Sequence, residues 1–378
     1  MMNKRERRRI EAIADANRDA GAAPRCPHFG ECGGCLFQDI PYEGQLAIKR
    51  RIVNDILDGI ASVDRVVPSS PFRYRSRMDM VTAFGKCGLR KAGSYRRVVD
   101  VSECHIMREK SEGIYRTIRP LLAGVEDYDY LHHQGYLRYV VFREAAFTGE
   151  VMVCFVTARR ENRLSEIIEA LPEPDSIALL HHPGAADLSF GEVYERIGKG
   201  SIEESLDGIR YRITPNTFFQ SNAAVALQIY RRIRDLAAGR VLDLCAGVGG
   251  ISLFIAGRVD HVIGVEVNHE SVLAAEENRI LNRISNAEFV CTDALSALKD
   301  ARGIDTVVMD PPRSGMGRES IRAVDRLGAE RIIYMSCNPA TFRQDADGLT
   351  SYRLEGVEAY DMFPQTPHVE LLGLFTRI

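Results

Sequence analysis

Residues 240–250 read Arg-Val-Leu-Asp-Leu-Cys-Ala-Gly-Val-Gly-Gly, and this stretch decides the fold class. Its first part is an apolar run typical of a buried strand, and the glycine-rich loop after it opens a helical pattern at Ile251. Strand-like and helix-like segments alternate in this way through residues 207–378. Such alternation predicts an α/β fold with a parallel, doubly wound, Rossmann-like sheet.

Acidic residues end the strand-like runs that follow this loop. Glu266 follows Gly247 at about the 20-residue spacing at which an acid grips the hydroxyls of a ribose. Asp293 ends the next run, where it can accept a hydrogen bond from the amino group of adenine, and Asp310 ends the run after that. Because residues 247–250 lack the last glycine of the dinucleotide fingerprint, S-adenosylmethionine fits these positions better than NAD.

Residues 335–339 read Met-Ser-Cys-Asn-Pro and follow another buried strand-like run, residues 331–334. Pro339 keeps Asn338 out of the helical region, so the chain turns there. Cys337 is therefore presented at the carboxyl end of a strand, where open α/β sheets bind their ligands. A thiol at that edge is a candidate nucleophile, whereas most free cysteines are only small buried hydrophobes.

A thiolate beside a methyl donor suggests methylation of a carbon that is not nucleophilic by itself, such as carbon 5 of uracil. Addition of the sulfur to carbon 6 makes carbon 5 nucleophilic, and a general base must then remove the proton from carbon 5. Glu370, directly before the apolar run 371–378, is the candidate base. His368 is the second candidate, although a role in shaping the loop suits it better.

Three cysteines near the start of the chain, Cys26, Cys32 and Cys35, have the spacing C-x5-C-x2-C with glycines between them. Glycines let a short loop fold tightly around an ion or cluster. Three thiolates need a fourth ligand to close a zinc or iron–sulfur site, and Cys104 is the best candidate for it. The spacing leaves zinc and iron–sulfur both open.

Composition limits the other properties. The chain has 378 residues, 45% hydrophobic and 27% charged, which is ordinary for a protein of two or three domains in water. No apolar run reaches the roughly 20 residues of a membrane helix. Nine cysteines, an odd number, fit a reducing compartment better than a disulfide scaffold. We therefore expect a cytoplasmic monomer with no membrane partner.

The net charge of −3 hides a basic segment. Residues 73–97 contain eight Lys or Arg and one acid, Asp79, and three aromatic residues stand among them: Tyr74, Phe84 and Tyr95. This mixture can hold phosphates and stack unpaired bases of RNA, although a basic sheet face is as often only solvated. The candidate RNA contacts are Arg73, Arg75, Arg90, Lys91 and Arg96.

The chain divides into three predicted parts. Residues 1–23 form a basic arm, residues 24–206 a smaller α+β domain, and residues 207–378 the α/β domain. Within the second part, the spacing of apolar residues predicts a helix over 41–60. The runs that read as strands there are 72–78, 88–97, 139–143 and 151–157.

Two motifs carry a resemblance to a known family. Residues 336–341, Ser-Cys-Asn-Pro-Ala-Thr, resemble the nucleophile motif of the RNA uracil-5-methyltransferases, and residues 361–370 resemble their general-base motif. The resemblance covers residues 26–378. Within the family it points more specifically to the iron–sulfur-containing members that act on 23S ribosomal RNA. It implies that Cys337 is the nucleophile and Glu370 the base.

The same resemblance implies further partners. The four cysteines match the ligands of a [4Fe–4S] cluster in those members, in which the central domain binds RNA and the helix after the third cysteine packs on the catalytic domain. Gln220 matches a glutamine that contacts the cofactor. The substrate implied first is ribosomal RNA, with transfer RNA as the alternative. The implied contacts to S-adenosylmethionine are Gln220, Cys245, Gly247, Gly250, Glu266, Asp293 and Asp310.

Three residues depart from the family pattern: Cys245 replaces an aromatic residue, Gly250 an asparagine and Gln365 a histidine. Three other functions fit the sequence less well. An RNA cytosine-5 methyltransferase would carry a cysteine near Asp310, and an amino-group methyltransferase would carry an aromatic residue in place of Arg313. A non-catalytic iron–sulfur RNA-binding protein is disfavoured because the nucleophile and the base are both intact.

Overall fold

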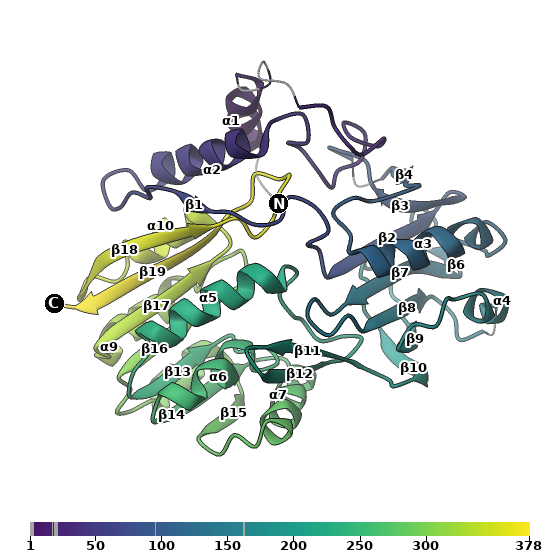
Figure 1. The fold of residues 1–378 in the computed structure, drawn as a ribbon. Helices are drawn as coiled ribbons and strands as arrows, with labels where there is room; N and C mark the ends of the chain where they lie inside the picture. Colours follow the sequence, from purple (N-terminus) through teal and green to yellow (C-terminus); the bar gives the residue numbers. More distant parts are fainter. Residues whose placement is uncertain (1–3, 17, 19–21, 95, 162) are drawn as a thin grey trace.

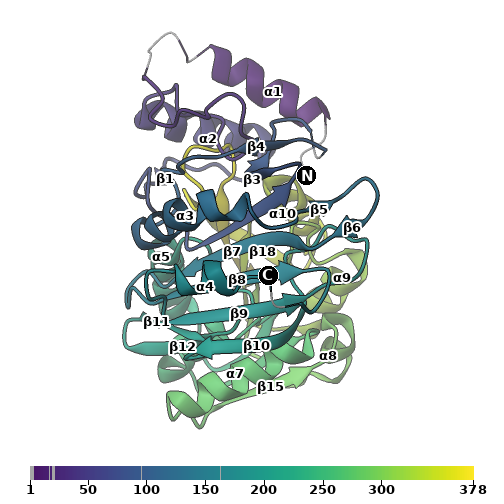
Figure 2. The same cartoon turned by 90° about the vertical axis from the view of Figure 1, so that its right-hand side faces the viewer.

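Two β-sheets organise the chain (Figures 1 and 2). One has eight strands and lies mostly within residues 207–378, and the other has seven strands from residues 77–198. Within the part of the chain that is described, no helix is long and apolar enough to cross a membrane. The computed structural model describes residues 4–16, 18, 22–94, 96–161 and 163–378.

The eight-stranded sheet has the order β1-β18-β19-β17-β16-β13-β14-β15. Its central strands are parallel, and the chain changes direction across the sheet between β13 and β16, which is where such sheets bind ligands. All the predicted strands of this region form. The parallel strands are β13 (Arg240–Leu244), β14 (His261–Glu266), β15 (Ala287–Cys291), β16 (Thr306–Met309) and β17 (Arg331–Ser336).

One strand departs from the predicted parallel arrangement, and one outer strand was not predicted. β19 (Glu370–Arg377) lies between β17 and β18 (Tyr352–Tyr360) and runs antiparallel to both. The connection from β18 to β19 is a loop, residues 361–369, and a loop this short can join only antiparallel neighbours. β1 (Val66–Val67) adds an outer strand parallel to β18, although it comes from the predicted central part of the chain.

Helices cover both faces of this sheet, as the strand–helix alternation predicts (Figures 1 and 2). α5, α6 and α7 pack in succession on one face, and α8 packs beside α9 on the other. The helices are α5 (Ala223–Leu236), α6 (Gly250–Ile255) with a 3₁₀ turn (Ala256–Arg258), α7 (His269–Leu281), α8 (Ala294–Asp300), α9 (Arg318–Leu327) and α10 (Pro339–Ala346).

The seven-stranded sheet has the order β10-β9-β8-β7-β2-β3-β4, and α3 (Glu109–Leu122) packs on β7 while α4 (Ser165–Glu169) packs on α3. A pair of two-residue strands, β5 (Tyr128–Asp129) and β6 (Gln134–Gly135), forms a separate small sheet that contacts β2. Its strands are β2 (Arg77–Ala83), β3 (Lys86–Arg90), β4 (Val98–Asp100), β7 (Leu137–Glu144), β8 (Val151–Thr157), β9 (Ser176–His181) and β10 (Glu192–Gly198).

Two predicted strands of this sheet have different bounds in the structure. The strand predicted over 72–78 begins only at Arg77, because Arg73 has a left-handed φ of +57°, which a strand cannot contain. The run 88–97 splits into β3 and β4, because Gly93 at φ +72° turns the chain between them. Tyr95 lies outside the described residues.

Two helices begin the chain, α1 (Lys4–Asp15) and α2 (Tyr42–Ile56), and they lie above the β18–β19 edge of the eight-stranded sheet in Figure 1. Residues 1–3, 17 and 19–21 of the predicted arm lie outside the described residues. α2 ends four residues earlier than the predicted 41–60, since the chain turns at Gly59 with φ +82°. α2 contacts β1 and α10, so it packs on the α/β part of the molecule.

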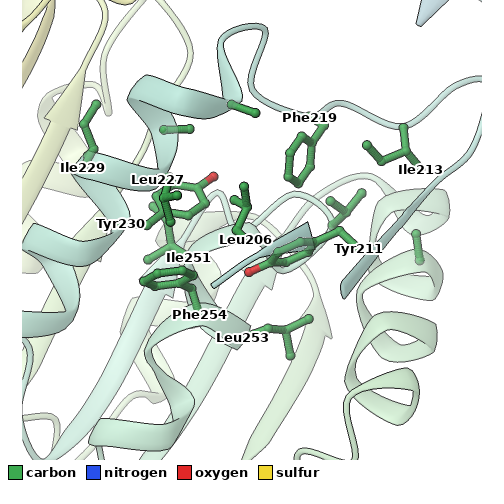
Figure 3. Close-up of a cluster of buried hydrophobic side chains, with 14 of the residues drawn as sticks. Leu206, Tyr211, Ile213, Phe219, Leu227, Ile229, Tyr230, Ile251, Leu253 and Phe254 are labelled. Atoms are coloured by element: carbon green, nitrogen blue, oxygen red, sulfur yellow. The ribbon is translucent and has the colours of Figure 1, made fainter. Parts of the chain in front are cut away.

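A hairpin joins the two sheets, formed by β11 (Ile202–Leu206) and β12 (Ile209–Ile213). Its Asp-Gly turn contains the predicted domain boundary, and both turn residues have the positive φ that such a turn requires. Figure 3 shows the hairpin packing on α5 and α6: the Tyr211 ring lies 5.3 Å from that of Phe219, and Tyr230 lies 5.8 Å from Phe254. One buried apolar cluster therefore runs from the seven-stranded sheet to the eight-stranded sheet.

Candidate active site

The segment that carries Cys337 is fixed by side chains of its own motif. Asn338 caps α10, its Oδ1 accepting from the backbone N–H of Ala340 at 3.1 Å. The Asn338 Nδ2 donates to the carbonyl of Arg313 at 3.0 Å, which ties this turn to the segment after β16. The Ser336 hydroxyl donates to the carbonyl of Asn338. Cys337 thus lies half-buried in a turn with a defined shape.

The register of the antiparallel strands brings Glu370 to this thiol. Ser336 of β17 pairs with Leu371 of β19, so one residue further along Cys337 stands opposite Glu370. Glu370 is buried and begins β19, and it pairs with Tyr360 of β18 on its other side. The structure therefore brings together the predicted nucleophile and the predicted base, which are far apart in the sequence.

Charged neighbours and burial perturb both groups. The pKa of Cys337 is raised to about 11, chiefly by burial and in smaller part by the charges of Glu370 and Asp310, while the Arg313 side chain opposes the shift by donating toward the sulfur. Burial also raises the pKa of Glu370 well above its ordinary value, with Asp310 adding to the shift and Arg313 opposing it. A carboxyl group with a raised pKa is a stronger base than an ordinary one.

The structure adds Arg313 to the site, and the sequence analysis missed this role. It is the one cation that affects the pKa of both Cys337 and Glu370 among the described residues. Its position directly after the Asp-Pro-Pro that follows β16 was a usable signal, because that segment ends at the ligand edge of the sheet.

His368 fits the role of base poorly. The pKa of its imidazole is lowered to about 3, chiefly by burial and in smaller part by the nearby charges of Arg313 and Lys49. A neutral imidazole with so low a pKa binds a proton weakly at pH 7. Its ring packs edge-on against Phe363 at 6.2 Å, so its contacts are those of a residue that shapes the loop.

The raised thiol pKa predicts how alkylation of Cys337 depends on pH. Only the thiolate reacts, so we expect the iodoacetamide rate at this residue to rise about tenfold per pH unit from pH 7 to 9.5, without a plateau. Peptide mass spectrometry measures that rate. Glu370→Gln should increase it at pH values at which Glu370 is ionised, because a negative neighbour is removed, and Arg313→Gln should decrease it. A plateau below pH 9 would contradict the predicted burial of the thiol.

The glycine-rich loop after β13 has space for a ligand above it. Cys245, Gly247 and Gly249 all have positive φ, of 67°, 55° and 81°, so the loop folds back tightly before α6. A Cβ added to Gly247 would meet no atom within 4 Å, whereas one added to Gly250 would meet the Tyr230 hydroxyl at 2.7 Å. Gly247 therefore leaves room for a ligand, and Gly250 allows the start of α6 to pack against Tyr230.

Two of the predicted acids, Glu266 and Asp310, lie around this loop. The Glu266 carboxylate accepts from the N–H of Gly247 at 3.0 Å and from the N–H of Asn268 at 2.9 Å. The Gln220 amide donates to the carboxylate of Asp310 at 3.1 Å. The pKa of Asp310 is raised to about 7, chiefly by burial and in smaller part by the charge of Asp243, while the Gln220 hydrogen bond opposes the shift.

Asp293 is exposed, unlike Asp310, and it caps α8. Its two oxygens accept from the N–H and the hydroxyl of Ser296, at 2.9 and 2.6 Å. These hydrogen bonds hold the pKa of the Asp293 carboxyl below its ordinary value. A cap of this kind also accounts for an acid at that position, so as a cofactor contact Asp293 stays a prediction.

The four cysteines line one small cavity between the N-terminal segment and the seven-stranded sheet. The thiols of Cys32 and Cys104 lie close enough to that of Cys35 to raise its pKa, in addition to the larger effect of burial. Yet in the described residues no group of three or more His, Cys, Asp or Glu side chains is arranged to hold a metal ion. The structure thus gathers the predicted ligands without establishing a metal site.

The predicted RNA contacts differ in their surroundings. Arg73 donates to the carbonyls of Cys104 and Met107, so it holds the chain beside the cysteine cavity. Arg75 donates to a backbone carbonyl two residues away. Arg90 pairs with Asp187 at 2.8 Å and stacks on the Tyr130 ring, and Lys91 is 3.5 Å from Glu31. Arg96 is exposed. As RNA contacts all five stay predictions.

Comparison with known proteins decides the family. Residues 199–378 match the family model described as tRNA (uracil-5-)-methyltransferase. The tRNA (uracil(54)-C(5))-methyltransferase of Pyrococcus furiosus is 35% identical to this chain over 357 residues, covering 94% of this chain and 85% of that protein. The chain belongs to the RNA uracil-5-methyltransferase family. It is an S-adenosylmethionine-dependent enzyme that methylates RNA.

Other members of the family extend this result to the fold. The crystal structure of the Pyrococcus abyssi tRNA (uracil-54, C5)-methyltransferase, in complex with S-adenosyl-L-homocysteine, superposes with a TM-score of 0.81 at 33% identity, covering 91% of this chain and 86% of that chain. An RNA methyltransferase of Caldanaerobacter subterraneus is 34% identical and covers 93% of this chain and 84% of that protein. The predicted family and fold class are thereby confirmed.

Proposed function

We propose that Cys337 and Glu370 methylate carbon 5 of a uracil in RNA. The Cys337 sulfur forms a bond to carbon 6, which moves negative charge onto the oxygen of carbon 4 and makes carbon 5 nucleophilic. S-adenosylmethionine, when bound, supplies the methyl group. Glu370 then accepts the proton of carbon 5, and the bond between carbon 6 and sulfur breaks to release the product.

The observation that carries this proposal is the position of Cys337 opposite Glu370, with Arg313 beside both. The reaction needs a sulfur on carbon 6 and a base near carbon 5, which are adjacent atoms of one ring. Two side chains from adjacent strand ends can contact adjacent ring atoms. Burial strengthens the base and excludes water from the reacting atoms.

The residues of the glycine-rich loop and its surroundings fit S-adenosylmethionine. Glu266, whose carboxylate accepts from the N–H of Gly247, is the proposed partner of the ribose hydroxyls, and the space above Gly247 supports an approach of the ligand to the backbone. Asp310, which accepts from Gln220, is close enough to raise the pKa of both Cys245 in this loop and Cys337. Cys245, Gly250 and Asp293 complete the proposed contacts. Weaker S-adenosylmethionine binding by Glu266→Gln in calorimetry tests the assignment.

Transfer RNA is the proposed substrate, ahead of ribosomal RNA. The Pyrococcus relatives named for a substrate are tRNA (uracil(54)-C(5))-methyltransferases, so the comparisons favour the alternative over the substrate implied first by the sequence. Uridine 54 of transfer RNA is therefore the proposed target. Arg73, Arg75, Arg90, Lys91 and Arg96 are the proposed contacts to its backbone, and weaker, less salt-dependent binding by charge-reversal variants of Arg90 and Lys91 tests this.

An assay with three RNAs tests the substrate. The protein and methyl-labelled S-adenosylmethionine are mixed with an unmodified transfer RNA transcript, with the same transcript carrying cytidine in place of uridine 54, and with a 23S ribosomal RNA transcript. We expect 5-methyluridine, identified by mass spectrometry of the digested RNA, only in the first. Methylation of the ribosomal transcript alone would restore ribosomal RNA as the substrate.

Cys26, Cys32, Cys35 and Cys104 are proposed to hold a [4Fe–4S] cluster, because all four line the same cavity. A cubane separates its thiolate ligands more widely than one ion does, since each ligand binds a different iron. The proposal rests on the shared cavity alone, since among the described residues no group of three or more His, Cys, Asp or Glu side chains is arranged to hold a metal ion. Iron and sulfide analysis of anaerobically purified protein tests the cluster, and stoichiometric zinc would contradict it.

The division of the chain is part of the same proposal. Residues 207–378 form the catalytic domain and residues 24–206 the domain for RNA and cluster, preceded by the arm 1–23. The α2 helix packs on the catalytic part, as expected for this family. Limited proteolysis tests the boundary at 206/207, and resistance of the hairpin β11–β12 would move the boundary before residue 202.

A further inference from the structure

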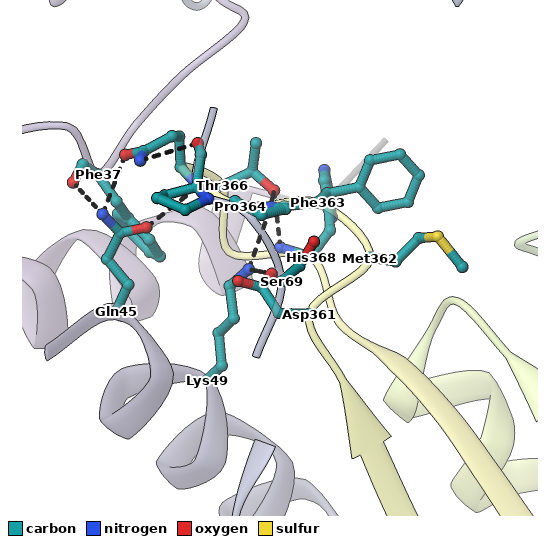
Figure 4. A network of polar contacts seen from close by, with 12 residues as sticks. Phe37, Gln45, Lys49, Ser69, Asp361, Met362, Phe363, Pro364, Thr366 and His368 are labelled. Carbon is teal, nitrogen blue, oxygen red and sulfur yellow. Dashed lines mark hydrogen bonds and ion pairs between the residues drawn. The ribbon is translucent and has the colours of Figure 1, made fainter. Parts of the chain in front are cut away.

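The loop that leads to Glu370 is held by a buried ion pair from α2 (Figure 4). The side chains of Lys49 and Asp361 are both fully buried and pair with each other. The Lys49 ammonium also donates to the carbonyl of Phe363 at 3.0 Å. On the other carboxylate oxygen, Asp361 accepts from the Tyr42 hydroxyl at 2.7 Å. Two residues of one helix therefore hold the first turn of the loop.

A second anchor holds the middle of the loop at Gln365. The Gln45 amide donates to the Gln365 side-chain oxygen at 2.9 Å, and the Gln45 oxygen accepts from the Gln365 N–H at 3.1 Å. Gln365 has a left-handed φ of +67°. The N–H groups of Leu36 and Phe37, directly after Cys35, both donate to the Gln365 carbonyl, at 2.8 and 3.1 Å.

These anchors lie next to the proposed base. Asp361 directly follows Tyr360, and Tyr360 is the cross-strand partner of Glu370. Both ends of the loop thus meet at Glu370, and a shift of Asp361 moves the strand pair that orients its carboxylate. Taking two charges out of water is unfavourable, and apolar residues of similar size often give equal stability. The ion pair, unlike an apolar pair, fixes the position of the loop by directed hydrogen bonds.

We propose that Lys49 is a positioning residue for Glu370. With Gln45, it holds loop 361–369 so that the Glu370 carboxylate reaches the proton on carbon 5 of uracil. Through the Gln365 carbonyl, the loop is also hydrogen-bonded to the segment that carries the first three cysteines, so its position depends on the conformation of that segment. The inference rests on the proposed role of Glu370 and extends it, because it names the residues outside the α/β part that control the proton-removal step.

The variant Lys49→Met tests the proposal, because methionine keeps the length of the side chain and removes its charge. Sulfur addition and methyl transfer precede proton removal, so a displaced Glu370 should slow only the last step. We expect methyl-labelled RNA to remain covalently attached to the protein, with release slowed at least about tenfold. Rapid quenching and denaturing gels measure both steps. Formation of the adduct and the affinity for S-adenosylmethionine should change less than about twofold.

Arg51→Met is the matched control, because Arg51 is an exposed cation on the same helix, and it should leave both steps unchanged. If Lys49→Met does not fold, the double variant Lys49→Met/Asp361→Asn is used instead, because it also removes the buried Asp361 charge that the single variant leaves unpaired. This double variant should still release its product slowly, because the hydrogen bonds of the ammonium are absent. Normal release by a folded variant of either kind would overturn the proposal.

Glu370→Gln separates this inference from the proposed function. If Glu370→Gln accumulates no adduct, the role of the base itself is wrong. If it does and folded Lys49→Met does not, only the positioning role is wrong. The combined variant Lys49→Met/Glu370→Gln should release product no more slowly than Glu370→Gln alone, since Lys49 acts through Glu370. If the two substitutions slowed product release by the product of their separate effects, Lys49 would act independently of Glu370, on another step.

Discussion

Replacement of Cys337 by alanine is expected to abolish methylation, with kcat lowered by at least about four orders of magnitude. No other group in the proposed reaction can make carbon 5 of uracil nucleophilic, so neither Glu370 nor the cofactor can compensate for the lost sulfur. Mass spectrometry of RNA digests measures the product. RNA containing 5-fluorouridine gives a second readout, because fluorine replaces the proton that the base removes and the protein stays covalently bound.

Two variants make this result specific to the sulfur. Cys337→Ser keeps a hydroxyl of similar size, and it should be nearly as inactive because a hydroxyl ionises far less readily than a thiol. Cys291→Ala removes an exposed cysteine at the end of β15, and we expect normal product and normal trapping. A fluorouridine adduct that persists in folded Cys337→Ala would assign the nucleophile to another residue.

Replacement of Glu370 by glutamine is expected to lower turnover by about two to four orders of magnitude while methyl transfer still occurs. The amide keeps the size of the side chain but cannot accept the proton of carbon 5. The methylated RNA should therefore remain bonded to Cys337, and a labelled methyl group should migrate with the protein on a denaturing gel. A variant that forms neither adduct nor product would show that Glu370 acts before methyl transfer.

The pH dependence of the wild type follows from the same residue. The pKa of Glu370 is raised, chiefly by burial, so the carboxyl remains protonated to higher pH than an ordinary glutamate. Only the ionised form accepts a proton, and product release should therefore increase as pH rises through that raised pKa. This increase should be absent in Glu370→Gln. His368→Asn is the control for the other candidate base, and it should not accumulate the adduct.

The sequence alone determined most of the eight-stranded sheet. β13 forms on the apolar run at the start of residues 240–250 and β15 on the run that precedes Asp293, because an apolar run between polar turns is a local pattern. The turn after β17 also followed from the sequence, since proline restricts the residue before it wherever it stands. Arg73 shows the limit of such patterns. Its left-handed φ depends on hydrogen bonds to a segment some thirty residues away, and the predicted strand started too early.

Only the tertiary structure decided how the site is assembled. Cys337 faces Glu370 because β19 inserts antiparallel between β17 and β18, and a strand run does not state its direction or its neighbours. Arg313 and Lys49 gained their roles in the same way, by packing of segments that are distant in the chain. Local sequence specifies the conformation of each segment through its own backbone, whereas register and burial arise from interactions among segments and appear only in the folded chain.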